Sequence, residues 1–384
     1  MNKEILSAQY YSVFHEPAEI TLRSPGRINI IGEHTDYNDG FVLPAAIDKA
    51  IFIAAAKRTD SQIHLYAEAF AELFSTDLQN IHPSAKTWPN YILGVVHELQ
   101  KANHPLTGFN LYLTGNLPVS AGVSSSAAVE CATVFALNEL MNLHLSKIEM
   151  VQLAQKAEHH FAGVLCGIMD QFASMMGKKN HAIQLDCRTL AYEYIPLHLK
   201  GYSIVLLNTN VKHSLASTAY NERRQQCEQG VALIQKKYPQ VLALRDATEA
   251  MLDECIKPFD VLIDQRCRFV VQEIQRLKDA CEDLKNNDIL SLGQKMFATH
   301  DGLSNEYEVS CKELDFLVNQ VRNNQHVAGA RMMGGGFGGC TINIIKKEEL
   351  QNIIHELSLS YEAEMRLPLT AIEVTVEDGT GFLQ

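Results

Sequence analysis

The spacing of hydrophobic and polar positions changes along the chain, from strand-like to helical and back. Apolar runs at 28–31 and 51–53 and an alternating segment at 109–113 predict strands, so we expect strands and turns up to about residue 116. Apolar residues then recur at helical spacing, which predicts helices at 126–141 and 146–161.

The second half of the chain repeats this change of spacing. A short helix is expected after Asp170, with strands at 182–185 and 203–207. From about 214 to 321 the pattern is mostly helical, because charged residues occupy one face and Leu, Ile, Val and Phe the other. Three elements complete the chain: a strand at 341–345, a helix at 347–361 and a strand at 370–376.

The interleaving of strands and helices indicates two layered lobes. The chain has 384 residues, which is long enough for more than one hydrophobic core. We divide it into an N-terminal lobe, residues 1–200, and a C-terminal lobe, residues 201–384. Enzymes built in this way usually place the functional site between the lobes.

The charge balance limits the kinds of partner that the protein is expected to bind. There are 33 Lys and Arg residues against 45 Asp and Glu residues, a formal net charge of -12. Binding to a phosphate backbone needs a basic face, so nucleic acid is not expected as a partner. An anionic small substrate would still need a locally positive pocket.

No feature indicates export or a membrane. The first 16 residues have no apolar core of signal-peptide length, and Asp48 and Lys49 interrupt the longest apolar stretch, 45–56. The nine cysteines contain no C-x-x-C pair, which favours reduced thiols over a disulfide framework or zinc site. We therefore expect a cytoplasmic enzyme with no membrane partner.

Residues 118–128, here called the phosphate loop, are the most informative segment. Gly122 lets the backbone approach a ligand, and Ser124, Ser125 and Ser126 then open the predicted helix. A helix N-terminus offers free N–H groups and partial positive charge, which suits an anion. A plain serine N-cap is the alternative, but one cap needs only one serine. The segment has no Walker A lysine.

A second segment, the Gly-rich loop at 333–340, has five glycines in six positions and precedes a β-run. A simple turn needs one or two glycines, so we expect this loop to pack closely on a ligand or another loop.

The third segment, 23–40, places Glu33, His34 and Asp36 just after a short apolar run. This cluster could bind a metal, form a solvated turn, or hydrogen-bond a polyhydroxylated ligand. Arg27, isolated in Pro-Gly-Arg, would be a free partner for a phosphate or a transition state.

The fourth segment contains Asp170 in an apolar surround. A carboxylate there is either a helix cap or a functional group. Upstream, Glu158 lies on a predicted helix, where a lone Glu is most often solvated.

Together these segments resemble the GHMP kinases, and among them the galactokinases. The stretch 26–40 is similar to the galactokinase N-terminal motif, 118–128 to the family's phosphate loop, and 334–339 to its third, Gly-rich motif. Further similarity at 167–171 and 220–224 extends the match over nearly the whole chain, and Val123 departs from the usual Leu.

The resemblance implies an α+β, two-lobed GHMP kinase fold with mixed sheets, helices on one side and the active site between the lobes. It implies ATP-dependent phosphorylation of the anomeric hydroxyl of α-D-galactose, the first committed step of the Leloir pathway. Galactose and MgATP would be the partners of a monomer.

The resemblance also assigns residue roles. Asp170 and Arg27 would be catalytic, and Mg²⁺ would be bound by Ser126 and Glu158. The sugar would contact Glu33, His34, Asp36 and Tyr220. The triphosphate would contact Ser120, Ala121, Gly122, Val123, Ser124, Ser125 and Ser126. Trp88, the only tryptophan, is similar in position to a family residue beside the adenine.

Two alternatives remain. A non-catalytic galactose sensor would share the fold, but the known yeast sensor lacks two residues after its serines, and 124–128 is unbroken here. A kinase for another sugar or for a non-sugar alcohol is the second alternative, and the Glu33–Asp36 cluster favours a sugar.

Overall fold

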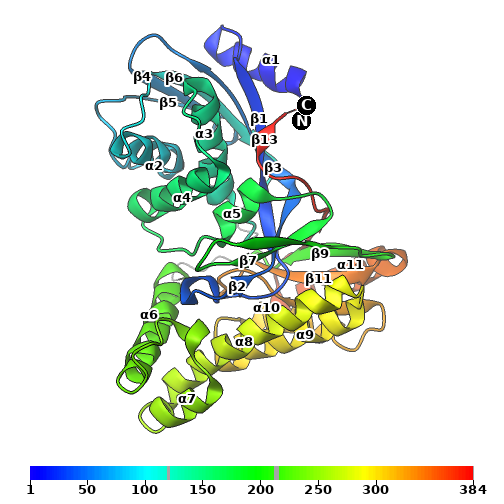
Figure 1. The fold of residues 1–384 in the computed structure, drawn as a ribbon. Helices are drawn as coiled ribbons and strands as arrows, with labels where there is room; N and C mark the ends of the chain where they lie inside the picture. Colours follow the sequence, from blue (N-terminus) through cyan, green and yellow to red (C-terminus); the bar gives the residue numbers. More distant parts are fainter. Residues whose placement is uncertain (119–121, 212–215, 384) are drawn as a thin grey trace.

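Two lobes are stacked along the long direction of the molecule (Figure 1). The structure is a computed structural model that describes residues 1–118, 122–211 and 216–383. The strands β4 (Gln62–Ala67), β5 (Glu72–Asp77) and β6 (Phe109–Gly115) lie at one end with the helix α1 (Lys3–Phe14). The helices α6 (Ala216–Gln235) and α7 (Glu249–Cys255) lie at the other end (Figure 1). No helix in this described part of the chain is long and apolar enough to cross a membrane.

The first lobe is built on a six-stranded sheet in the order β13-β1-β3-β6-β4-β5. Its neighbours are antiparallel except β4 and β6, which run parallel, so the sheet is mixed. The strands are β1 (Ile20–Asn29), β3 (Pro44–Lys57), β4 (Gln62–Ala67), β5 (Glu72–Asp77), β6 (Phe109–Gly115) and β13 (Gly381–Phe382).

Alternate side chains of this sheet enter two different cores, as the period of a strand requires. Ile51, Ile53 and Leu111 face the main core, which is covered by four helices, whereas Phe52 and Ala54 face α1 (Lys3–Phe14). The four helices are α2 (Thr87–Lys101), α3 (Ser125–Met141), α4 (Lys147–Ala157) and α5 (Met169–Met176).

The second lobe is built on an antiparallel sheet in the order β10-β11-β9-β12. Val205 and Leu207 face α10 and α11, and Ile204 and Leu206 face α8 and α9. The elements are β9 (Tyr202–Asn208), β10 (Val327–Met332), β11 (Cys340–Lys346), β12 (Thr370–Val374), α6 (Ala216–Gln235), α7 (Glu249–Cys255), α8 (Val261–Lys285), α9 (Ile289–Asp301), α10 (Lys312–Val321) and α11 (Leu350–Met365).

A small third sheet, in the order β2-β7-β8, lies between the two larger ones (Figure 1). Its strands are β2 (Phe41–Val42), β7 (His181–Asp186) and β8 (Tyr192–Pro196). The C-terminal end returns to the first lobe, because β13 pairs with β1. The division at residue 201 stays a prediction, although β9 begins the second sheet at Tyr202.

The expected α+β, two-lobed architecture is confirmed, but the expectation that helices lie on only one side of the sheets is too simple. They cover both faces of the second sheet, and α1 covers part of the outer face of the first. The reason is physical: both faces of these strands are apolar, and each has to be covered.

The expectation of only strands and turns before residue 116 is wrong, since α1 and α2 lie there. The helix α2 was not predicted because Pro89 and the β-branched pair Val95–Val96 are typical of non-helical segments, although one face of α2 is buried. The predicted helix at 146–161 is α-helical only to Ala157, and β10 was not predicted because Gly and Ala weaken its strand pattern.

Candidate active site

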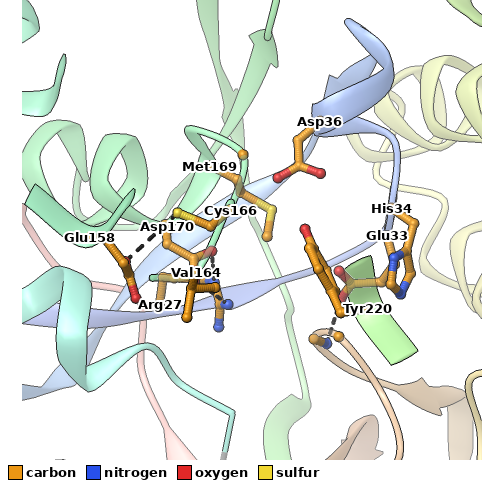
Figure 2. Close-up of a pocket in the computed structure, with 13 residues that line it drawn as sticks. Arg27, Glu33, His34, Asp36, Glu158, Val164, Cys166, Met169, Asp170 and Tyr220 are labelled. Carbon is orange, nitrogen blue, oxygen red and sulfur yellow. Dashed lines mark hydrogen bonds and ion pairs between the residues drawn. The ribbon is translucent and has the colours of Figure 1, made fainter. Parts of the chain in front are cut away.

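A pocket of about 160 Å³ lies where the two lobes meet. Figure 2 shows Arg27, Glu158 and Asp170 on one side, facing Glu33 and Tyr220 across the cavity. The full lining is Arg27, Glu33, His34, Asp36, Glu158, Val164, Cys166, Gly167, Met169, Asp170, Tyr220, Gly334 and Gly335. It therefore unites the predicted catalytic and sugar-binding side chains.

Arg27 is not the free cation that its isolation in the sequence suggests, so that expectation is wrong. Its guanidinium donates two hydrogen bonds of 2.7 Å to the two carboxylate oxygens of Asp170 and one of 2.5 Å to the Gly122 carbonyl. Burial lowers the pKa of Arg27, but the charge of Asp170 and these hydrogen bonds outweigh it and raise the pKa overall. The bidentate geometry fixes both side chains.

The local backbone explains how Arg27 reaches this position. The register between β1 and β3 shifts between Pro25 and Arg27, as expected for a bulge that re-aims a side chain. Gly26 allows it, because a Cβ there would lie 2.7 Å from the Val123 carbonyl oxygen. Arg27 also donates its backbone N–H to that carbonyl, at 3.1 Å. The strand and the phosphate loop are thus tied together.

Asp170 is a pairing residue and not a helix cap. It is the second residue of α5, whose N-cap, Ile168, makes no side-chain cap. Besides Arg27, its carboxylate accepts a hydrogen bond from the Ser124 hydroxyl. The carboxylate therefore connects α5, β1 and the N-terminus of α3.

A second pocket, of about 250 Å³, adjoins the first and shares Arg27, Gly334 and Gly335 with it. The remaining lining is Pro118, Gly122, Val123, Ser124, Ser125 and Ser126. Ser120 and Ala121, also predicted to bind the triphosphate, lie outside the described residues.

The N-terminus of α3 is left open towards this second pocket. Ser124 is the N-cap residue, with a left-handed backbone (φ 54°), and its hydroxyl binds Asp170 and makes no cap. The first helical bond is donated by Ala128. A plain serine cap is therefore excluded, and N–H groups of the first turn face an anion-sized space.

Ser126 and Glu158 are neighbours, as the predicted metal site requires. The Ser126 hydroxyl donates to Glu158 Oε1 at 2.8 Å, and Glu158 is the first residue of a π-helical turn that continues α4. Burial raises the pKa of Glu158, and the hydrogen bond from Ser126 opposes that rise. Glu158 is buried, so the solvated reading of this residue is wrong.

Gln171 and Glu130, which the sequence did not point to, complete this corner. Gln171 Nε2 donates to Glu158 Oε2 at 2.7 Å and to Glu130 Oε2 at 3.1 Å. Glu130 Oε1 is buried with no hydrogen-bond partner among the described residues. Burial and the charge of Glu158 raise the pKa of Glu130 well above its usual range. This concentration of buried oxygen atoms suits a hard divalent cation.

No group of three or more His, Cys, Asp or Glu side chains forms a metal site within the described ranges. The predicted pair supplies only a hydroxyl and a carboxylate. Mg²⁺ usually keeps waters and substrate phosphates as its other ligands, so two protein oxygens are compatible with it.

Glu33 is held by the second lobe. Its Oε1 accepts hydrogen bonds from Arg331 Nη2 at 3.1 Å and from the Gly334 N–H at 2.8 Å. Arg331 is fully buried and also donates to the carbonyls of Asn29 and Ile30. Sequence reasoning missed Arg331, although an arginine beside a Gly-rich loop was a usable signal.

The Gly-rich loop packs on other loops, as expected. Gly334 has a left-handed backbone (φ +84°) and donates its N–H to Glu33, and a Cβ on Gly334 would lie 3.8 Å from the Gly122 carbonyl oxygen. A Cβ on Gly335 would lie 3.3 Å from the Tyr220 ring. The loop thus forms a common wall of both pockets.

Asp36 depends on a close approach to Gly167. A Cβ at Gly167 would lie 1.8 Å from Asp36 Oδ2, so only glycine fits there. Burial, the charge of Asp170 and other effects raise the pKa of Asp36 to about 7. Asp36 therefore holds a proton more readily than an ordinary aspartate.

His34 is buried and stays neutral. Burial lowers its pKa to about 3, the positive charge of Arg223 contributes, and a hydrogen-bond interaction with the Gly335 backbone opposes the change. Its ring lies 5.4 Å from that of Tyr220, centroid to centroid, so Tyr220 stands between elements of both lobes. Trp88 is buried, and its Nε1 donates to Glu72 at 2.8 Å; contact with adenine stays a prediction.

Comparison with known proteins agrees with this geometry. Three family models match the chain: "GHMP kinases N terminal domain" at residues 90–178, "Galactokinase galactose-binding signature" at 8–57 and "GHMP kinases C terminal" at 280–363. The chain is 40% identical to a galactokinase of Thermotoga neapolitana, over 93% of this chain and 98% of the relative. It is 39% identical to a galactokinase of Limosilactobacillus reuteri, over 99% of both.

Solved structures give the same result. The galactokinase of Lactococcus lactis, crystallised with galactose, matches with a TM-score of 0.95 and 33% identity, over 99% of both chains. The mevalonate kinase of Methanococcus jannaschii shares the fold, with a TM-score of 0.65 and 18% identity, over 94% of this chain and 98% of the other.

Proposed function

The chain belongs to the galactokinase family of the GHMP kinases, and on this basis we propose that it is a phosphotransferase acting on galactose. It transfers the γ-phosphoryl group of ATP to the anomeric hydroxyl of α-D-galactose and gives galactose 1-phosphate and ADP. One observation carries the proposal: Arg27, paired with Asp170, lines both the sugar pocket and the phosphate-loop pocket. A transferred group has to pass between two such pockets.

Asp170 orients the sugar hydroxyl and takes its proton. Phosphoryl transfer has a loose transition state, so the position of the attacking oxygen matters more than the strength of the base. The hydrogen bonds from Arg27 and Ser124 fix the Asp170 carboxylate at the junction of the pockets. From there it accepts the proton as the new P–O bond forms.

Arg27 stabilises negative charge. Its guanidinium is held by Asp170 and the Gly122 carbonyl, so it is in place before the substrates bind. A preorganised cation at the transferring group costs no rearrangement during the reaction.

Ser126 and Glu158 are the proposed ligands of Mg²⁺, and Gly122 to Ser126 are the proposed contacts of the triphosphate, together with Ser120 and Ala121. The adjacent Ser126 hydroxyl and Glu158 carboxylate support this assignment. When bound, Mg²⁺ neutralises charge on the β- and γ-phosphate oxygens. The phosphate loop itself supplies N–H groups and no lysine.

Glu33, His34, Asp36 and Tyr220 are the proposed contacts of the sugar hydroxyls. Their convergence on one small pocket supports a polyol ligand, which needs several fixed donors and acceptors. We also propose a cytoplasmic monomer divided near residue 201. The nine unpaired cysteines are consistent with a reducing compartment, and sedimentation tests the monomer.

A coupled ADP-release assay with galactose tests the function directly. We expect turnover that requires galactose, MgATP and the Asp170 carboxylate. Galactose binding in calorimetry without any turnover would instead indicate a sensor. A panel with N-acetylgalactosamine, glucose and mevalonate tests the substrate, and a clear preference for any of these over galactose would overturn the assignment.

A further inference from the structure

A chain of hydrogen-bonding groups runs behind the sugar pocket from the second lobe to His34. Cys227 Sγ on α6 lies 3.2 Å from the Tyr307 hydroxyl, which lies 2.8 Å from the Tyr37 hydroxyl. The Tyr37 hydroxyl lies 2.8 Å from His34 Nδ1. Tyr307 and Cys227 are almost completely buried. None of these contacts takes part in the reaction steps above.

The other ring nitrogen of His34, Nε2, is buried and makes no hydrogen bond of normal geometry in the described part of the chain, although an interaction of the ring with the Gly335 backbone opposes the fall in the His34 pKa. A buried polar atom without a partner is costly and needs an explanation. His34 lines the sugar pocket, so an entering hydroxyl is the natural partner. Whether Nε2 donates or accepts depends on which nitrogen carries the proton.

The two phenols determine the tautomer. Burial raises the pKa of Tyr37 and of Tyr307 well above the usual range, so each keeps one proton to donate. If Tyr307 donates to Tyr37 and Tyr37 donates to Nδ1, the ring proton lies on Nε2. In the opposite direction, Nδ1 carries the proton and Nε2 is a bare acceptor.

The pocket favours the first direction. Glu33 and Asp170 present carboxylates, which accept hydrogen bonds when ionised. Arg27 and the Gly334 N–H already donate to protein oxygens. The Tyr220 hydroxyl and a protonated Asp36 can each donate one hydrogen bond, but a sugar has several hydroxyls, and Nε2–H supplies a further donor.

We propose that Tyr37 and Tyr307 are positioning residues for sugar recognition, which hold His34 as the Nε2–H tautomer so that it donates to a hydroxyl of galactose. The proposal rests on the proposed function. The role of the Tyr307 hydroxyl can be tested apart from the packing of its ring. The ring centroids of His34 and Tyr307 lie 4.9 Å apart, and a phenylalanine would keep this ring contact while removing the hydroxyl.

Steady-state kinetics of Tyr37→Phe and Tyr307→Phe give the first test. Each variant should raise the KM for galactose about tenfold, the size expected for one weakened hydrogen bond, with kcat changed less than about threefold. The matched control is Tyr10→Phe, since Tyr10 is also buried and donates to Glu16 at 2.8 Å in a separate core. A lower kcat with unchanged KM in the Tyr37 and Tyr307 variants would overturn the proposal.

Nitrogen-15 NMR of the histidine rings gives a second test that needs no turnover. His34, assigned by its absence in His34→Gln, should show an unprotonated Nδ1 and a protonated Nε2, and Tyr37→Phe should give a mixture of tautomers. A protonated Nδ1 in the unsubstituted protein, or spectra unchanged by Tyr37→Phe, would contradict the proposal. Lack of galactose turnover in the unsubstituted protein would overturn only the proposed function, because the tautomer can be measured without sugar.

Monodeoxygalactoses locate the contact. If the hydroxyl that accepts from Nε2–H is removed from the sugar, the KM of Tyr307→Phe should rise little further, because that hydrogen bond is already weakened in the variant. Removal of any other hydroxyl should raise the KM of the variant by the same factor as in the unsubstituted protein. Additive effects at every hydroxyl would argue against a donor at His34. Thermal unfolding of each variant separates these results from misfolding, and Tyr37→Phe keeps the test open if Tyr307→Phe does not fold.

Discussion

The two halves of the site are built in different ways. In the sugar half, Glu33 and His34 are 2% and 4% exposed, and groups of the second lobe, Arg331 and Tyr307, hold them directly or through Tyr37. In the phosphate half, Gly122 and Ser125 are exposed, and the described serines are anchored only through Ser124 to Asp170 and Ser126 to Glu158.

This difference follows from the two ligands. Galactose is uncharged, so its recognition depends on hydrogen-bonding groups that are already in place and satisfied on their far sides. The triphosphate is strongly charged, and under the proposed assignment helix N–H groups, Arg27 and a bound cation would attract it even where the protein surface is exposed. The net charge of -12 is therefore no obstacle, because the positive charge needed is local.

The largest effect is expected where the two halves join. Asp170→Asn should lower kcat at least about a thousandfold, because it removes the proton acceptor and weakens the hold on Arg27. Galactose should still bind in calorimetry. Asp186→Asn is the control, since Asp186 is also paired with an arginine, Arg245, but lies outside the pocket. Near-normal turnover of Asp170→Asn would refute its role as base.

Arg331→Met should destabilise the sugar half, because it removes the arginine that holds Glu33. The substitution leaves the buried Glu33 carboxylate without its charged partner, so the free energy of unfolding should fall by about 3 to 5 kcal/mol in urea denaturation. Arg322→Met removes an arginine paired with Asp301 at the surface and should cost about 1 kcal/mol or less. Equal losses in the two variants would show that the buried Arg331–Glu33 pair contributes no more to the free energy of unfolding than the surface pair.

Ser126→Ala should affect the phosphate half with only a small loss of stability, because the buried Glu158 keeps its hydrogen bond from Gln171. We expect the Mg²⁺ concentration needed for half-maximal rate to rise roughly tenfold, because a proposed ligand of the metal is lost. The affinity for Mn²⁺ measured by electron paramagnetic resonance should fall in parallel. Ser203→Ala is the control, since the Ser203 hydroxyl also donates to a glutamate, Glu373, at 2.6 Å, but lies outside both pockets. If Ser126→Ala required the same Mg²⁺ concentration as the unsubstituted protein, Ser126 would not be a ligand of the metal.

The pH dependence of stability distinguishes Asp36 from an ordinary aspartate. The pKa of Asp36 is raised from about 3.8 to about 7 on folding, so between these values the folded state binds more protons than the unfolded state. This contribution to stability is complete below pH 4 and is lost as the pH rises through 7. The free energy of unfolding should therefore fall more steeply from pH 5 to pH 8 in the unsubstituted protein than in Asp36→Asn.

Asp186→Asn is again the control for that slope. Although burial opposes it, hydrogen bonds from Arg245 lower the pKa of Asp186 to about 2, so its titration lies below the measured range. Asp186→Asn should keep the slope of the unsubstituted protein. The same slope in Asp36→Asn would show that Asp36 does not hold a proton in the folded state.

Much of the fold could be read from local pattern. Strong periodicity predicted α3, β9 and β11 at nearly their observed positions. It failed for α2, where a proline and β-branched residues imitate a strand, and for β10, where Gly329 and two alanines give no strand signal. Packing of a buried face decided both elements, and propensity did not.

The candidate site could be predicted as a set of residues but not as an arrangement. Sequence motifs singled out Arg27, Asp170, Glu33 and Glu158, and the family resemblance predicted Glu158 as a metal ligand. From the residues alone, however, Arg27 was expected to be free and Glu158 to be solvated. Tyr307 was missed because a buried tyrosine has no local signature until its partners are known, and Arg331 was missed although it lies beside the Gly-rich loop.

The sequence by itself determined most of the strands and helices, apart from elements such as α2 and β10, and it determined the short motifs, since these depend on residues a few positions apart. Only the tertiary structure decided which motifs meet. Arg27 finds Asp170 143 residues away, Tyr37 finds Tyr307 270 residues away, and Arg331 finds Glu33 298 residues away. A buried charge or hydroxyl is stable only with a partner, and the topology of the two lobes selects that partner.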